Sequence, residues 1–284
     1  MIVIAQSRGP NLRWQSSLLL TLVVSAVAAS MLAESAGFGP VLIAKGIGIG
    51  GAFGLLVWRL RAATPGAALT GALFTAALYV AAPGWRSLLW PLLGLFVLTF
   101  AATRFGRRRK EQLQVAEERK GRSASQVAAN LGAAALASIP ISGCHFFVLL
   151  PRSFGRAMLI ALIAALAEAT ADTLSSEMGE VLGGEPVLLT SLQRVPAGTD
   201  GAISLAGTLA GCAGAVGIAL IAMLVLPMSW AEALTALLAG ILGLFVDSLL
   251  GATIERRGWL NNDAVNFFST LAAAGSALLI AGWL

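Results

Sequence analysis

The chain has 284 residues, of which 57% are apolar and only 12% are charged. Soluble globular domains carry about 25% charged residues, whereas apolar runs long enough to span a bilayer, ~20 residues each, recur here along the whole chain. These properties exclude a secreted disulfide scaffold, a DNA-binding domain and a soluble Rossmann enzyme. The sequence therefore predicts an all-α, polytopic transmembrane helical bundle.

Nine apolar spans are predicted along the chain. They lie at approximately residues 16–33, 38–58, 66–82, 86–103, 126–150, 155–178, 202–227, 231–254 and 264–284. We expect the first span to be retained as a helix rather than cleaved as a signal peptide. Pro140 and Gly143 predict a break or a kink in the fifth span. In the second span, Gly46-x-Gly48-x-x-Gly51 follows no strand, so it indicates close helix packing rather than a dinucleotide site.

Basic residues are distributed unevenly between the two sets of loops. If the N-terminus is cytoplasmic, fifteen of the 19 fall in inner loops and three in outer loops, while Lys45 lies inside a span. Inner loops of membrane proteins are enriched in Lys and Arg. We therefore expect a multi-pass protein of the inner or plasma membrane, with a cytoplasmic N-terminus and an outer C-terminus. The net charge of +5 indicates orientation rather than nucleic-acid binding.

The loop at residues 104–125 is the most basic stretch of the chain. Its pattern predicts a short amphipathic helix on the cytoplasmic face. Two roles fit this composition: anchoring to anionic lipid headgroups, or binding an anionic substrate.

Carboxylates inside the spans are functional candidates, because an ionisable group in lipid is costly. Glu168 and Asp172 are four residues apart and share one helix face, and Glu177 follows at the cytoplasmic end of the same span. Asp247 lies close to the cytoplasmic end of the eighth span. We predict that Asp172, Glu177 and Asp247 converge at one depth as catalytic residues that hold magnesium, which binds a few carboxylates together with water and phosphate oxygens.

Other roles stay open for these carboxylates. They can form structural ion pairs with Lys45, with Arg194 or among themselves, or they can line a proton or cation pathway. Glu168 lies deeper, and orienting a neighbouring residue is one role open to it. Lys45 can extend its ammonium to the nearer interface or bind an anion.

A glycine-containing loop connects the sixth and seventh spans and leads directly into a helix. Such a turn presents backbone N–H groups and the positive end of the helix dipole to an anion. Arg194 adds a planar, forked donor that suits phosphate. We predict a phosphate-binding loop, although the same pattern is typical of an ordinary turn with a helix cap; its residues are Arg194, Gly198, Thr199, Asp200 and Gly201.

Three asparagines lie at the cytoplasmic ends of other spans. Asn262 and Asn266 are four residues apart and share a face, and Asn130 is placed just inside the fifth span. We predict that they line the same cytoplasm-facing substrate site, with hydrogen bonding between helices as the alternative. The single histidine, His145, lies far from the acids and is assigned a structural role.

Several of these motifs, taken in order, resemble the integral membrane family called domain of unknown function 92, which includes animal transmembrane protein 19 and the plant chloroplast phytyl-phosphate kinase. The resemblance rests on Asp172-Thr-Leu-Ser-Ser-Glu177-Met-Gly179, Arg194-Val-Pro-Ala-Gly198-Thr-Asp-Gly201, Asp247-Ser-Leu-Leu-Gly251-Ala, Lys110, Gly121-Arg122, Gln126-Val-x-Ala-Asn130 and Val265-Asn266-Phe-Phe-Ser-Thr. Leu174 and Ser175 stand where the family often has Trp-Ala, and Glu255 stands where glutamine is common.

The resemblance implies a kinase-type transferase. Its reaction would be magnesium-dependent transfer of a phosphoryl group from CTP or ATP to a phytyl-, farnesyl- or geranylgeranyl-like isoprenyl monophosphate. It adds Lys110, Lys120 and Arg122 to the expected phosphate-binding residues. A membrane transporter or channel for an ion or small anion, using the intramembrane carboxylates, is the alternative.

The expected domain organisation is simple. Residues 1–284 form a single integral membrane domain in the bilayer. Within it, residues 1–59 supply N-terminal helices, residues 60–284 form the core that resembles the family, and residues 104–125 form the basic cytoplasmic loop.

Overall fold

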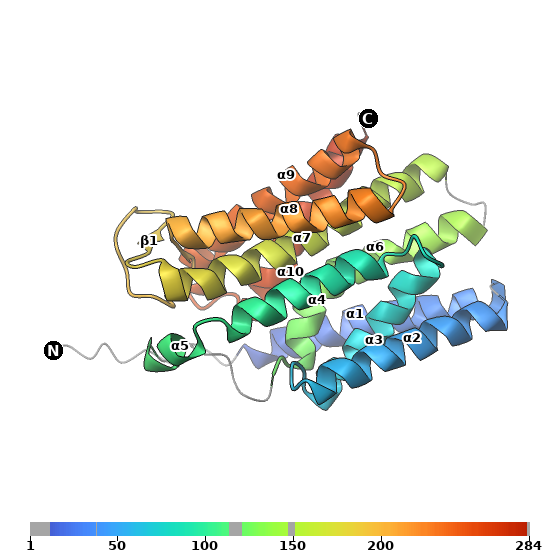
Figure 1. The fold of residues 1–284 in the computed structure, drawn as a ribbon, viewed down its shortest axis with the longest axis horizontal. Helices are drawn as coiled ribbons and strands as arrows, with labels where there is room; N and C mark the ends of the chain where they lie inside the picture. The colour runs from blue at the N-terminus through green and yellow to red at the C-terminus, as the bar shows by residue number, and fades with distance from the viewer. Residues whose placement is uncertain (1–11, 38, 114–120, 147–150, 283–284) are drawn as a thin grey trace.

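The computed structural model describes residues 12–37, 39–113, 121–146 and 151–282, and it shows a bundle built almost entirely of long helices (Figure 1). The helices are α1 (Arg13–Gly37), α2 (Pro40–Arg59), α3 (Pro65–Ala81), α4 (Leu89–Arg104), α5 (Arg107–Leu113), α6 (Ala124–Phe146), α7 (Arg152–Leu182), α8 (Leu205–Val225), α9 (Trp230–Leu250) with the π-helical segment η1 (Gly251–Glu255), and α10 (Asn262–Ala281). Two short strands, β1 (Val187–Leu188) and β2 (Ala202–Ile203), pair antiparallel. The prediction of an all-α membrane bundle is confirmed; the strand pair and η1 were not predicted.

Each of the nine predicted spans corresponds to one apolar helix in the described residues. Seven of these helices are long and apolar enough to cross a membrane on their own. The α4 helix reaches that length only together with α5, across a bend of 60°. The α3 helix, with 17 residues, is shorter. The bundle therefore supports about nine spans, two of which are short.

Leucines on the outer faces of the bundle are exposed, as helices in contact with lipid require. On α8, for example, Leu205, Leu209 and Leu224 are all exposed. Such a continuous apolar surface would be a large exposed patch on a protein in water. In a bilayer the same surface faces hydrocarbon, and the backbone polar groups are satisfied within each helix.

The centre of the bundle is α7, which packs against α4, α6, α8, α9 and α10. All residues from Ile160 to Ala171 are 2% exposed or less. A helix that is buried on every side belongs in the core, and this explains why residues 160–167 of α7 are apolar on all faces. Any polar group on this part of α7 therefore faces another helix and not lipid.

Small residues allow the helices to approach closely. Gly50 of α2 has no room for a side chain, because a Cβ there would lie 2.2 Å from the carbonyl oxygen of Ala72 in α3. In contrast, Gly48 and Gly51 have no neighbouring atom within 4 Å of that position. Of the three glycines predicted to serve helix packing, only Gly46 does so; the close contact with α3 follows the i, i+4 stripe of Gly46, Gly50 and Gly54 instead.

The expected features near α5 and in the fifth span are met in part. A short helix, α5, lies within the basic loop at residues 104–125, as predicted. The α6 helix continues through Pro140 as far as Phe146, so the described residues contain no break at this proline.

Successive long helices alternate in direction, so that α1 begins at the end of the bundle that carries α5 and β1, and α10 ends at the opposite end (Figure 1). Hydrogen bonds at the first end support this placement. Ser16 of α1 donates to the carboxylate of Asp263 in α10 (2.6 Å), and Gln15 donates to the carbonyl oxygen of Trp259 (2.8 Å). The loops with most of the basic residues therefore gather at one end.

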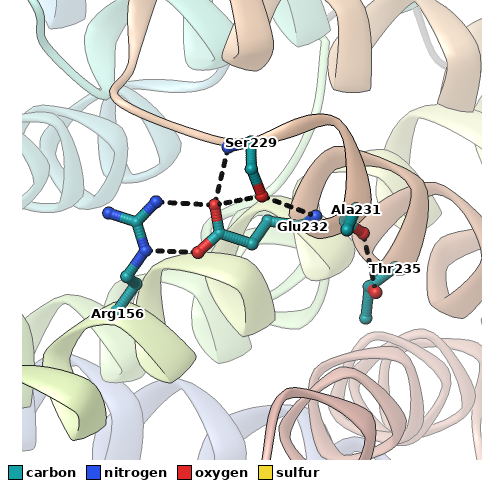
Figure 2. A network of polar contacts seen from close by, with 5 residues as sticks. All are labelled: Arg156, Ser229, Ala231, Glu232 and Thr235. Carbon is teal, nitrogen blue, oxygen red and sulfur yellow. Dashed lines mark hydrogen bonds and ion pairs between the residues drawn. The ribbon is translucent and has the colours of Figure 1, made fainter. Parts of the chain in front are cut away.

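The opposite end is held by a polar network that joins α7 to α9 (Figure 2). Arg156 of α7 forms a two-pronged ion pair with Glu232 of α9; its Nη2 lies 2.8 Å from Oε2. Glu232 also accepts from the backbone N–H of Ser229 (2.6 Å), and its own N–H is capped by the Ser229 hydroxyl (3.3 Å). This reciprocal capping box fixes the start of α9 against α7 far from the predicted site.

The alternation of helices predicts the sidedness of three exposed positions near the helix ends. In a variant without native cysteines, Cys introduced at Arg86 and at Ser153 should react from one side of the membrane, and Cys introduced at Ser191 from the other. The measurement is labelling of intact cells or sealed vesicles with a membrane-impermeant maleimide. Labelling of Ser153→Cys and Ser191→Cys from the same side would contradict the crossing by α7.

Candidate functional site

A polar cavity of about 360 Å³, here called the acidic cavity, lies at the end of the bundle where α7 ends and α10 begins. Side chains of α6, α7, α9, η1 and α10 line it, together with the connection between α7 and α8. It brings together most of the residues that the sequence singled out: Arg122, Asn130, Asp172, Glu177, Gly198, Thr199, Asp200, Gly201, Asp247, Asn262 and Asn266.

Two carboxylates from different helices meet at the inner wall of the cavity. Asp172 of α7 and Asp247 of α9 both line it, close enough for their charges to interact. Glu168 lies one turn deeper on α7 and is 1% exposed. Neither carboxylate oxygen of Glu168 has a hydrogen-bond partner among the described residues, nor does Oδ1 of Asp247. Ser269, the nearby hydroxyl on α10, donates instead to the carbonyl oxygen of Asn266 (3.0 Å).

Of these three oxygens only Oδ1 of Asp247 belongs to the cavity lining, where an unpartnered carboxylate oxygen can accept a cation; Glu168 is not part of the lining. Buried polar atoms are almost always hydrogen-bonded, and a buried carboxylate without a partner is costly. Magnesium is commonly held by one or two carboxylates, with waters and substrate phosphates filling its remaining positions. The pair Asp172 and Asp247 fits that requirement. Among the described residues, no three His, Cys, Asp or Glu side chains are grouped closely enough to hold a metal ion by themselves.

Glu177 and Lys110 are arranged differently from the prediction. The carboxylate of Glu177 lines the cavity, but it is ion-paired with the ammonium of Lys110. Lys110 is 1% exposed and also donates to the carbonyl oxygens of Ala102 (2.9 Å) and Thr103 (3.4 Å). The three-carboxylate magnesium cluster is therefore not formed, and Lys110 does not line the cavity. Its ammonium joins α5 to the ends of α4 and α7.

Arg194 also lies away from the cavity. Its guanidinium pairs with Glu185 at 2.8 Å, and both side chains are more than 70% exposed. The physical reason is the strand pair: Val187 bridges to Arg194 and also pairs with Ile203, which folds this connection into a small hairpin. The predicted phosphate contact from Arg194 is thus not supported by this placement. Lys120 lies outside the described residues.

Arg122 is the basic residue that the described cavity lining does contain. Its backbone is fixed by two hydrogen bonds, from its N–H to the carbonyl oxygen of Ala62 and from the N–H of Thr64 to its own carbonyl oxygen, both 3.0 Å. Its Nη2 donates to the hydroxyl of Thr173 on α7 (3.2 Å). Thr173 directly follows Asp172 on α7, so this contact holds the guanidinium of Arg122 close to that carboxylate. A planar, forked cation of this kind suits phosphate.

The turn at residues 198–201 lines the acidic cavity, as predicted. Gly198 and Gly201 have φ values of +80° and +70°, a region that favours glycine. The helix start behind the turn is already capped, because the Ser204 hydroxyl accepts from the N–H of Gly207 (3.1 Å). Burial raises the pKa of the Asp200 carboxyl above its usual value, and the nearby Arg256 partly opposes this shift.

Close packing fixes this turn beside Asp247. A Cβ on Gly201 would lie 2.0 Å from the backbone nitrogen of Ala252 and 2.4 Å from the carbonyl oxygen of Ser248. Both atoms belong to the end of α9 and the start of η1. The loop and the carboxylate helix therefore pack backbone against backbone, and glycine is required on the loop side.

Gly201→Ala is therefore expected to destabilise the protein more than Gly184→Ala. Gly184 has a similar φ of +63°, but its Cβ position has no atom within 4 Å. Both variants carry the cost of a left-handed residue, roughly 1–2 kcal/mol, and Gly201→Ala adds about 1–3 kcal/mol of overpacking. Thermal unfolding in detergent measures the difference; equal losses for the two variants would contradict the close contact.

Two acids of the cavity, Glu180 and Glu255, were not predicted from the sequence. Six acidic residues line the described cavity against the one arginine: Asp172, Glu177, Glu180, Asp200, Asp247 and Glu255. Glu180 lies in the last turn of α7, and Glu255 ends η1. On a regular α-helix, Glu255 would lie about 80° around the axis from Asp247. Because η1 is a π-helical segment, of a kind often found at functional sites, regular spacing did not predict this residue.

The predicted asparagines line the acidic cavity on the side formed by α6 and α10. Nδ2 of Asn266 donates to Oδ1 of Asn130 at 3.5 Å, and Asn130 donates to the carbonyl oxygen of Gln126 (2.9 Å). Both residues line the cavity, as does Asn262 in the first turn of α10. Asn130 and Asn266 therefore line the cavity and also form a hydrogen bond between helices, so the two predicted roles are compatible.

Comparisons with known proteins identify relatives of this chain. Residues 48–274 match the family model described as integral membrane protein DUF92. An uncharacterized membrane protein of Methanocaldococcus jannaschii is 38% identical over 189 residues, which cover 66% of this chain and 74% of that protein. An uncharacterized membrane protein of Synechocystis sp. is 33% identical over 200 residues, covering 70% and 75% respectively.

A plant protein is among the relatives as well. The Arabidopsis thaliana protein named VTE6, chloroplastic, is 30% identical over 191 residues, which cover 65% of this chain and 56% of that protein. No solved structure matches the chain.

Proposed function

This chain belongs to the DUF92 family of integral membrane proteins, and from that premise we propose that it transfers a phosphoryl group from CTP or ATP to an isoprenyl monophosphate in the acidic cavity. Phosphoryl transfer needs mainly positioning and neutralisation of charge. The acidic cavity offers carboxylates for a divalent cation, a forked arginine and a glycine turn. The resemblance to a family that includes the phytyl-phosphate kinase supports the choice of an isoprenyl acceptor.

The observation that carries the proposal is the charge of the cavity. Its described lining has six acids and one arginine, so a polyphosphate would be repelled unless cations enter with it. Asp172 and Asp247 would hold magnesium, which stabilises negative charge on phosphoryl oxygens. Arg122 would orient the phosphate of the acceptor through its planar fork.

The location of the cavity supports a lipid-like acceptor and a cytoplasmic nucleotide. The cavity lies at the end of the bundle that gathers most of the basic loops, and such loops usually face the cytoplasm. A substrate with an apolar tail reaches this site from the bilayer, while its phosphate meets the nucleotide at the interface.

Cation transport is the competing function, and the buried Glu168 is the observation in its favour. An unpartnered carboxylate deep in a bundle is typical of ion pathways. However, residues 160–167 of α7 are at most 2% exposed, and the described cavity lining does not include Glu168. A site open at one end suits an enzyme better than a pathway across the membrane.

The direct test is an assay of the purified full-length protein in detergent micelles. Farnesyl, geranylgeranyl and phytyl monophosphate are each supplied with magnesium and CTP or ATP, and the diphosphate is quantified by mass spectrometry. We expect diphosphate with at least one pairing, and its loss on chelation of magnesium. No diphosphate from any pairing, together with cation flux in reconstituted liposomes, would replace the kinase with a transporter.

A further inference from the structure

A second cavity, of about 300 Å³, lies beside the acidic cavity and is lined mainly by apolar residues of α2, α3, α4 and α6. We call it the apolar cavity. Along α4 its lining extends from Leu92 to Arg104, a distance of about 18 Å at the rise of an α-helix. It therefore extends from the basic end of the bundle through more than half the thickness of a hydrocarbon core, which is about 30 Å.

The wall of the apolar cavity is apolar in its depth and basic at one end. Phe96 packs against Phe53 and Phe100, with ring centroids 5.5 and 5.3 Å apart. Arg61, Arg104, Arg107 and Arg122 line it as well, and no acidic residue does so among the described residues. This charge pattern is the reverse of that in the acidic cavity. It is complementary to a ligand with an anionic head and an apolar tail.

The two cavities share Arg122 and Asn130 in their linings. Arg122 is held in place by the packing of Gly121, whose Cβ position lies 2.5 Å from the carbonyl carbon of Ala62 and whose φ is +77°. A head group at Arg122 would therefore be accessible from the acidic cavity while the tail lies in the apolar one. Because this volume is at the lower limit of ligand pockets, roughly 300–1,000 Å³, it suits one chain rather than the two chains of a phospholipid.

We propose that the apolar cavity binds the tail of the acceptor, a single-chain lipid monophosphate whose phosphate lies at Arg122. The identity of the head group rests on the proposed function. The inference adds a separate binding site for the tail and assigns the two substrates to different cavities. The acidic cavity receives the nucleotide, and the apolar cavity selects the acceptor by the length of its tail.

Gly71 of α3 provides the test. It lines the apolar cavity, and a Cβ there would meet no atom within 4 Å. The side chain of Gly71→Leu therefore starts in free space at the cavity wall and is expected to occupy part of the cavity. Leucine also favours a helix more than glycine does. Gly48→Leu in α2 is the matched control, because Gly48 also has free space around its Cβ position and lines neither cavity.

We expect Gly71→Leu to weaken binding of farnesyl monophosphate by roughly ten-fold or more, the scale of discrimination in apolar pockets. Binding of dimethylallyl monophosphate and of the nucleotide should be unchanged, and Gly48→Leu should behave as the parent. Binding is measured by competition with a farnesyl monophosphate that carries a photoreactive group at the end of its tail. In the parent protein this probe should label α3 or α4, as mapped by mass spectrometry.

The outcomes separate this inference from the proposed function. If the probe labels α3 or α4, Gly71→Leu abolishes this labelling and no diphosphate forms, the result supports the tail site and argues against the kinase activity. Diphosphate formation with the same dependence on tail length in Gly71→Leu and the parent overturns the tail site and leaves the kinase. The tail site is also overturned if excess phospholipid prevents the labelling whereas excess farnesyl monophosphate does not.

Discussion

Replacing either Asp172 or Asp247 with asparagine is expected to lower phosphoryl transfer by at least about 100-fold while the protein stays folded. The two carboxylates come from α7 and α9 and both line the acidic cavity. Loss of either would remove charge stabilisation worth several kcal/mol, and each ~1.4 kcal/mol is ten-fold in rate. Asparagine keeps the shape of the side chain and removes one of two adjacent negative charges, so the fold is not expected to weaken.

The measurement compares turnover and its magnesium dependence with thermal unfolding in the same detergent. Glu185→Gln is the matched control, because it removes an exposed carboxylate that does not line the cavity. Near-normal turnover of Asp172→Asn or Asp247→Asn with unchanged magnesium dependence would show that the replaced residue is no metal ligand. A large loss of stability in the asparagine variants would instead assign the pair a structural role.

The helices themselves were predictable because the bilayer leaves few alternatives. A chain with apolar runs of spanning length must satisfy its backbone polar groups within helices, and each of the nine runs corresponds to a helix in the described residues. The packing of these helices against one another was harder to predict from the sequence. Periodicity identifies a buried face only where the opposite face is polar, and α7 is apolar on all sides over residues 160–167. The sequence therefore did not show that α7 lies at the centre.

The same reasoning explains which site residues could be found. Polar residues within a few turns of the span ends were informative, because lipid offers them no partner, and Asp172, Asp247 and Asn266 do line one cavity. Partners in distant segments were not predictable: Lys110 lies 67 residues from Glu177, which it pairs with. Arg194 was misplaced because a short strand pair turns its loop outward. Glu255 was missed because a π-helical segment breaks the regular spacing.

The ion pair between Lys110 and Glu177 leads to a large expected effect on stability. Lys110 is 1% exposed and Glu177 is 14% exposed. Removing one partner of a buried pair leaves the other charge without compensation, which typically costs about 3–5 kcal/mol. We therefore expect Lys110→Met and Glu177→Gln each to lower the unfolding free energy by about that amount. The double variant should recover most of the loss, because it leaves no unpaired charge.

A matched pair on α5 provides the control for this prediction. Arg107 and Glu111 are also ion-paired, at 3.1 Å, but their side chains are 36% and 42% exposed. Exposed pairs contribute about 0–1 kcal/mol, so Arg107→Met should change stability little. Reversible unfolding in mixed micelles measures all four variants. If Lys110→Met keeps its stability but requires more isoprenyl phosphate for half-maximal turnover, Lys110 binds substrate in solution, and the structural role given to it by its contacts with Ala102, Thr103 and Glu177 is wrong.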